Sequence, residues 1–291
     1  MELPLVVGVD GSEPSLQAVD WAVAEAARHG LPLRVVYASL WERYEGAVPA
    51  DEEDPSEQAM AERILGTATE RAVRGAPDVK VSADVVPEDA VSALLEEGHH
   101  AFALVTGSRG RGELAGLLLG SVSLAVAGRA HCPVIVVRGD KAGLAGTHER
   151  ILLGVGEPSS GGEEAVRFAF READVRGCTL DAVRAWRRPA HESADHPLLG
   201  GSPAHYHQQR ASEELDAALH DAATDHPSVR VRRATVEGPA RKVLPARSAA
   251  ADLLVIGARR RHDHGGLQLG RVAHTLLHHA DCPVVVVPEQ G

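Results

Sequence analysis

The sequence of 291 residues is poor in several residue types, and each shortage excludes a class of protein. It contains only three cysteines, an odd and sparse set that provides no disulfide framework and favours a reducing compartment. Aromatic residues make up 3%, too few for base-stacking platforms, and the formal net charge of −11 opposes generic binding to nucleic acid phosphates. No apolar run is long enough to span a bilayer, and no basic leader precedes an apolar core. We therefore expect a cytoplasmic protein with neither a membrane nor a nucleic acid as partner.

Histidine is plentiful, with 16 residues, which raises the question of a metal site. His274 and His278 lie four residues apart on an expected helix, and His262 and His264 are close by in the sequence. No cysteine or carboxylate joins them at a spacing typical of zinc sites. We interpret these histidines as solvent-exposed or packing residues.

The chain contains an internal sequence repeat that spans about half its length. The segment Ala18–Ala38 aligns without a gap to Ala165–Ala185, and residues 103–137 align in the same way to 253–287. A period of about half the chain is far longer than that of a solenoid repeat, so it indicates a duplicated domain. We predict domains at residues 1–138 and 149–291, joined by a small, glycine-containing linker over 139–148.

Short apolar runs alternate with stretches of helical periodicity in each copy. Runs such as LVVGV, ALVTG and PVIVV are apolar throughout rather than at every second position, which is typical of parallel strands covered on both faces. Each copy is therefore predicted to be a five-stranded, doubly wound α/β domain. The polar regions 41–58 and 187–210 do not match each other and are predicted to be loops. The valine-rich last strands, 134–137 and 284–287, are expected at sheet edges, which invite pairing.

Glycines gather after the expected fourth strand of copy one, in GSRGRGELAGLLLGSVS (Gly107–Ser123). Gly107 and Gly110 lack a Cβ atom, so backbone N–H groups can approach a ligand there. Gly120 and Ser121 precede an apolar helix, and a helix N-terminus favours a phosphate group. The chain has no Gly-Lys pair and orders these glycines as GxxGxG, which excludes a P-loop and a dinucleotide fingerprint. An anion cradle accounts for all these residues, whereas turns alone account for one or two of the glycines.

The spacing Gly107-x2-Gly110-x9-Gly120-Ser121 resembles the nucleotide-binding signature G-x2-G-x9-G-[S/T] of the universal stress protein family. The opening VGVDGSEPS and the closing HCPVIVV also look like that family's first and last strands. The resemblance covers nearly the whole chain twice, as in tandem actinobacterial members. It implies Rossmann-like domains of the adenine nucleotide alpha hydrolase type, paired through their last strands as an intramolecular pseudo-dimer. Further assembly into a homodimer is compatible with this reading.

The resemblance also implies one ATP site, in copy one, with Mg²⁺ on the phosphates. The residues that would hold phosphates and ribose are Gly107, Gly110, Gly120, Ser121 and Val122. Asp10 is expected near the ribose or the phosphate-bound metal. Alternatively, its carboxylate holds the turn after the first strand and contacts no ligand. Ala38 is expected to present its backbone to the adenine edge. Arg109 either neutralises phosphate charge or is a solvated loop residue.

Copy two departs from this signature at three positions, with Gly156 for Asp10, Arg260 for Gly110 and Arg271 for Ser121. A long side chain in place of glycine blocks close approach of the backbone. We expect that copy two binds no ATP and that its arginines occupy the vacant pocket or pair with carboxylates. The alternative is that they clamp a different anion through charge-assisted hydrogen bonds.

The function predicted on these grounds is an ATP-binding regulatory or sensor module of the stress or growth-arrest response, acting through an unidentified regulatory partner. No paired carboxylates and no placed general base stand beside the glycine-rich loop in the sequence, so we predict no dedicated catalysis. Two alternatives stay open: a slow metal-dependent ATPase that uses Asp10, and a nucleotide-free scaffold.

Overall fold

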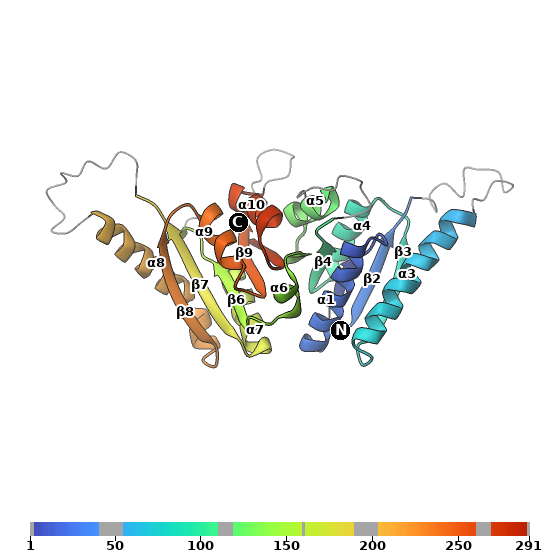
Figure 1. Ribbon diagram of the computed structural model, residues 1–291, viewed down its shortest axis with the longest axis horizontal. Helices are drawn as coiled ribbons and strands as arrows, with labels where there is room; N and C mark the ends of the chain where they lie inside the picture. Colours follow the sequence, from blue (N-terminus) through green and yellow to red (C-terminus); the bar gives the residue numbers. More distant parts are fainter. Residues whose placement is uncertain are drawn as a thin grey trace. The chain divides into compact units, whose positions relative to one another are not determined.

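The computed structural model describes residues 3–40, 55–109, 119–158, 161–188, 203–259 and 269–289 (Figure 1). The chain divides into two compact units, Met1–Arg138 and Gly139–Gly291, and each has its own layered α/β arrangement. Within the described ranges, no helix combines the length and the apolar character needed to cross a membrane.

The first unit contains parallel strands in the order β3-β2-β1-β4-β5. Their bounds are β1 Leu5–Gly8, β2 Leu33–Ala38, β3 Val81–Val86, β4 Ala103–Gly107 and β5 Val134–Val137. Two helices that contact each other cover one face, α1 (Glu13–His29) and α3 (Pro55–Gly75). The other face is covered by α4 (Ala90–Glu97), a 3-10 turn at Gly98–His100, and α5 (Ser121–Arg129).

The strand order of the first unit reverses between β1 and β4. The chain steps from β1 to β2 and β3 on one side, and then crosses back to β4 on the other side of β1. Val7 of β1 pairs with Val105 of β4, so the carboxyl ends of these strands lie side by side. In doubly wound sheets this switch point is where ligands bind.

The second unit repeats the arrangement with parallel strands in the order β10-β9-β6-β7-β8. The strands are β6 Arg150–Gly154, β7 Thr179–Trp186, β8 Arg230–Glu237, β9 Leu253–Arg259 and β10 Val284–Glu289. The helices are α7 Glu163–Arg176, α8 Pro203–Asp225, α9 Ala240–Ser248 and α10 Arg271–His279. The prediction of two tandem, doubly wound parallel α/β domains is confirmed.

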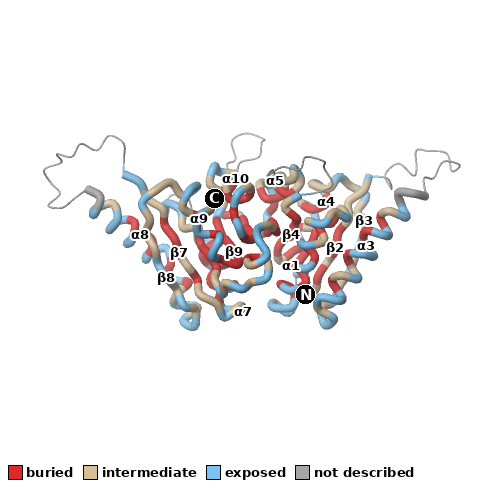
Figure 2. Tube along the Cα trace, viewed as in Figure 1, coloured by how far each residue is buried: buried red, intermediate tan, exposed pale blue. Residues whose placement is uncertain are grey.

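The core follows from the apolar strands that the sequence contains (Figure 2). All residues of β4 are buried, and Leu5, Val6 and Val7 of β1 are each at most 1% exposed. On α1, one face buries Ala18, Val19, Ala22, Val23 and Ala26. Because helices cover both sheet faces, strands of this kind need no polar alternation.

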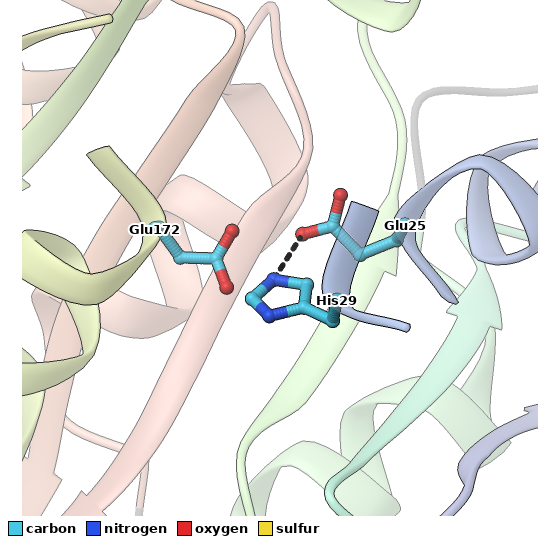
Figure 3. Close-up of side chains that lie close together, drawn as sticks. All are labelled: Glu25, His29 and Glu172. Atoms are coloured by element: carbon cyan, nitrogen blue, oxygen red, sulfur yellow. Dashed lines mark ion pairs between the residues drawn. The ribbon is translucent and has the colours of Figure 1, made fainter. Parts of the chain in front are cut away.

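Local signals set the ends of α1. Ser12 caps its N-terminus by accepting a hydrogen bond from Ser15 N, and Gly30 ends it in the left-handed conformation, with φ +65°. In the last turn, Glu25 accepts a hydrogen bond from Arg28 at 2.8 Å and lies 3.6 Å from Nε2 of His29 (Figure 3). These basic groups lie at the helix end where carbonyl oxygens carry partial negative charge.

Segments predicted as irregular contain helix. The expected linker 139–148 contains α6 (Lys141–Ala145), which begins because the Asp140 carboxylate accepts from Gly143 N at 2.8 Å. Asp140 N also donates to Asp281 O at 3.0 Å, so this segment is attached to the second unit. Helices α3 and α8 begin at Pro55 and Pro203, inside the ranges 41–58 and 187–210 that were predicted as loops, since proline is compatible with the first helical turn.

Candidate functional site

The glycine-rich segment of the first unit leaves β4 and returns to the start of α5 beside it. Ser108 N donates to Val137 O at 3.0 Å, and Gly120 N donates to Ser108 O at 2.9 Å. The first bond attaches Ser108 to the end of β5, and the second joins the two ends of the segment at the carboxyl end of β4. Gly110, one of the predicted site residues, lies outside the described residues.

The N-terminus of α5 presents backbone donors that no side chain caps among the residues the structure describes. Its N-cap residue is Gly120, with φ −62° and ψ 142°, and the first helical bond runs from Leu124 N to Gly120 O. The N–H groups of the first turn have no acceptor within the helix. Ser121, which is exposed, and Val122, which is half-buried, are the first two helical residues. Donors and a hydroxyl group at a helix N-terminus suit an anion.

Gly120 and Gly107 serve different purposes in the structure. A Cβ atom on Gly120 would stand 3.6 Å from Cα of Arg109, an ordinary contact, so packing alone does not require glycine there. A Cβ atom on Gly107 would stand 2.6 Å from the carbonyl oxygen of Pro14. Gly107 is therefore explained by the close approach of β4 to the first turn of α1.

Arg109 is exposed and directly follows Ser108, whose carbonyl receives the Gly120 bond. Its backbone is thus next to the start of α5, and it supplies a positive charge from the described part of the loop. Either a contact with phosphate or solvation in the loop fits this position.

Asp10 follows β1 and shapes the turn that leads into α1. Its Oδ1 accepts from Ser12 N at 3.0 Å and from Ser12 Oγ at 2.6 Å. Gly11 between them has φ +79°, a left-handed conformation that glycine adopts without strain. One carboxylate oxygen therefore holds the turn, which is the structural role that the sequence analysis gave as the alternative for Asp10. A role toward ribose or Mg²⁺ stays a prediction for Asp10.

Ala38 ends β2, two residues beyond the last ladder pair with β1. Gly8 pairs with Val36, and Val9 N donates to Val36 O at 2.9 Å, whereas Ala38 pairs on its other side with Val86 of β3. The edge of Ala38 that faces β1 thus lies past the end of that ladder. A half-buried backbone edge in this place is where the adenine contact is expected.

The corresponding strand ends of the second unit surround a cavity of about 1500 Å³. Relative to the aligned Ala18 and Ala165, α7 begins about one turn later than α1. The cavity is lined by Gly156, Gly161, Arg259, Gly270 and Arg271, among others. Arg260 and Arg261 lie outside the described ranges. The two arginines that are described, Arg259 and Arg271, line this cavity. Since Arg260 is not among the described residues, the expectation that the arginines of copy two occupy the pocket or pair with carboxylates stays a prediction.

A carboxylate from β10 caps the delayed start of α7. Glu289 is 5% exposed and accepts from Glu164 N at 3.2 Å and from Ala165 N at 3.1 Å. The N-cap residue of α7 is Gly162, which has no side chain to perform this task. A Cβ atom on Gly257 would stand 2.5 Å from Oε1 of Glu289, so this glycine makes room for the capping carboxylate.

The universal stress protein family model matches residues 3–138 and again residues 147–288. The chain belongs to the universal stress protein family. A universal stress protein of Mycobacterium tuberculosis strain H37Rv is 36% identical over 292 residues, with 97% of this chain and 96% of that protein covered. A second one from the same strain is 30% identical over 297 residues, with 99% and 97% covered. A crystal structure of a universal stress protein from Archaeoglobus fulgidus has a TM-score of 0.66 at 16% identity, covers 99% of this chain and 96% of that chain, and shows the same fold.

In this universal stress protein, the described residues of the signature lie on one closed loop and the helix start that follows it: Gly107, Arg109, Gly120, Ser121 and Val122. Asp10 and Ala38 lie at the ends of the next two strands. Sequence reasoning missed Ser123, whose buried hydroxyl donates to the carbonyl of Gly107 at 2.8 Å and attaches α5 to β4. The sequence feature that could have indicated this role is a second serine, two residues after Ser121, in an otherwise apolar helical segment.

Proposed function

We propose that this universal stress protein binds ATP in its first domain and acts as a regulatory module rather than as a dedicated catalyst. The observation that carries the proposal is the uncapped N-terminus of α5 beside the loop closed by Ser108 and Gly120, at the switch point of a doubly wound sheet. Such a site has backbone donors and, among the described residues, no competing carboxylate cap, which suits a phosphate group.

The residues around this point fit the parts of ATP. The first-turn N–H groups of α5, the hydroxyl of Ser121 and the charge of Arg109 suit the phosphates. The backbone edge of Ala38 on β2 suits the adenine, because β2 and β4 are separated only by β1, about 10 Å apart at two strand spacings. When bound, Mg²⁺ would neutralise phosphate charge, with Asp10 as the nearest carboxylate of the predicted site.

Regulation follows from where the site lies. A nucleotide that contacts Gly120 and Ser121 covers the end of the first domain at which β4 meets α5. Exchange of ATP for ADP, or loss of the nucleotide, changes the charge and shape of that end. We place the recognition of a regulatory partner there.

The first experiment is to denature the purified protein and identify the released nucleotide and its ratio to chain. Stripped protein is then titrated with Mg·ATP, ADP, AMP and cyclic AMP by calorimetry, and phosphate release is followed over hours. We expect about one ATP per chain, one binding event on titration and no multiple turnover. Absence of both released nucleotide and binding heat would refute the site, and two ATP per chain would refute its restriction to the first domain.

A further inference from the structure

The second domain has a smaller cavity of about 710 Å³ between the end of β7 and the start of α8, which adjoins the larger one and shares Gly156 and Glu214 with it. Arg184 and Trp186 line it from β7, and His207, Arg210 and Glu214 line it from α8. The three helix residues recur at spacings of three and four, so they lie on one helix face. The volume is within the range of small-molecule sites in proteins.

The charge around this cavity favours an anion. Five arginines and three glutamates line this cavity and the larger one that adjoins it, in a chain whose formal net charge is −11. Three of the arginines, Arg184, Arg187 and Arg210, line the smaller cavity. More of the arginines therefore lie at the β7 end of the combined space than at the start of α10.

Glu214 orients two of these arginines. It accepts from Nη2 of Arg184 through one carboxylate oxygen and from Nε of Arg210, at 3.0 Å, through the other. Nη1 of Arg184 donates to the carbonyl of Gly156. The hydrogen bond that Arg210 donates to Glu214 raises the pKa of Arg210, so this guanidinium stays charged.

Two buried donors at the cavity have no acceptor. Arg184 is 7% exposed, and its Nε has no hydrogen-bond partner among the described residues, nor does Nε1 of Trp186. Residues two apart in a strand point to the same face, so both donors lie on one side of β7. Buried donors without partners are costly, and a bound oxyanion would satisfy them. The aligned residues of the first domain are Tyr37 and Ser39, so this donor pair is particular to the second domain.

The cavity also has a flat aromatic wall. The rings of Trp186 and His207 are stacked, with centroids 6.3 Å apart and planes inclined by 23°. We propose that the second domain binds a small organic anion with a flat aromatic body, a carboxylate or a phosphate monoester, in this β7–α8 cavity. The proposal is independent of nucleotide binding in the first domain, because every residue it uses belongs to the second unit.

The test is a calorimetric titration of the full chain with benzoate, phenyl phosphate, inorganic phosphate and benzyl alcohol. We expect at least one of the two aromatic anions to bind at least tenfold more tightly than inorganic phosphate and than the neutral alcohol. The stronger of the two identifies the oxyanion as carboxylate or phosphate. Binding should change tryptophan emission, and Trp186→Phe should abolish most of this change. The same variant keeps a smaller aromatic ring at this position, loses the N–H donor and should weaken binding about tenfold.

Arg187→Gln and Arg188→Gln form a matched pair, since each removes one positive charge at adjacent positions. Only Arg187 lines the cavity, whereas Arg188 pairs with Glu237 at 3.1 Å. We expect a several-fold loss of affinity in the first variant and little change in the second. The proposal is overturned if neither aromatic anion binds, if inorganic phosphate binds equally well, or if Trp186→Phe and Arg187→Gln both leave affinity unchanged. Stoichiometric displacement of the aromatic anion by ATP would also overturn it.

Discussion

Replacing Gly120 with aspartate tests the nucleotide site without disturbing the fold. Gly120 is the N-cap of α5 in an extended conformation, φ −62° and ψ 142°, and among the described residues a Cβ atom there would meet no atom closer than 3.6 Å. An aspartate accepts hydrogen bonds from the first-turn N–H groups and puts negative charge at the positive end of the helix. We expect the free energy of unfolding to rise by about 0.3–1 kcal/mol.

The same carboxylate competes with phosphate for those donors. Two unit charges 4 Å apart interact by about 1 kcal/mol in water and by about 4 kcal/mol near a protein surface. Since about 1.4 kcal/mol is a factor of ten in affinity, we expect Gly120→Asp to weaken Mg·ATP binding at least tenfold. A variant that is more stable and yet binds less ATP cannot be explained by loss of the fold.

Gly270→Asp is the matched control in the second domain. Gly270 is the N-cap of α10, and a Cβ atom there would have no described atom within 4 Å, so aspartate should raise the melting temperature there too. ATP affinity should not change. Thermal denaturation and calorimetry of both variants give the result. If Gly120→Asp were stabilised and bound ATP as before, the assignment of α5 would be wrong; if only Gly270→Asp lost ATP, the site would belong to the second domain.

Other predictions concern stability and thiol reactivity. Gly107→Ala should lower the free energy of unfolding by about 1–3 kcal/mol, since its Cβ would stand 2.6 Å from Pro14 O, whereas Gly120→Ala should cost no more than about 1 kcal/mol; urea denaturation measures both. Glu289→Gln should cost about 1–3 kcal/mol in the same assay, because an amide donor would then face the N–H groups that the carboxylate caps. Burial raises the pKa of the Cys178 thiol, so its thiolate fraction at pH 8 is low. Its reaction with Ellman's reagent should therefore be slower in the native protein than in urea, and equal rates would contradict this.

Features of the fold that depend on local signals could be predicted from the sequence. Apolar strands, the duplication and the end of α1 at Gly30 all follow from patterns within a few residues of each other. The start of α8 at Pro203 could not be predicted, because its first turns are polar and contain no apolar periodicity. His207 and Arg210 were therefore assigned to a loop, and the β7–α8 cavity had no signal in the sequence.

Contacts between distant residues account for the rest. Glu289 caps α7 across more than a hundred residues, and the sequence gives no sign that the last strand of the second domain supplies this carboxylate. The late start of α7 is visible only as a run of serine and glycine before Glu163. Its consequence, a wide cavity in place of a helix turn, depends on how β9, β10 and α7 pack together.

The two domains also show which signature positions bear on a ligand. Gly107 and Gly257 are both glycine, but each is required by a different neighbour, the Pro14 carbonyl in one domain and the Glu289 carboxylate in the other. Glycine at that position therefore says little about nucleotide binding. At Gly120 and Gly270 no contact with another described residue requires glycine, so the residue after each of them is the better indicator of nucleotide binding. A serine hydroxyl follows in the first domain and an arginine in the second. The inference of one nucleotide per chain thus rests on the start of α5. The contacts among the described residues do not explain why glycine and serine stand there.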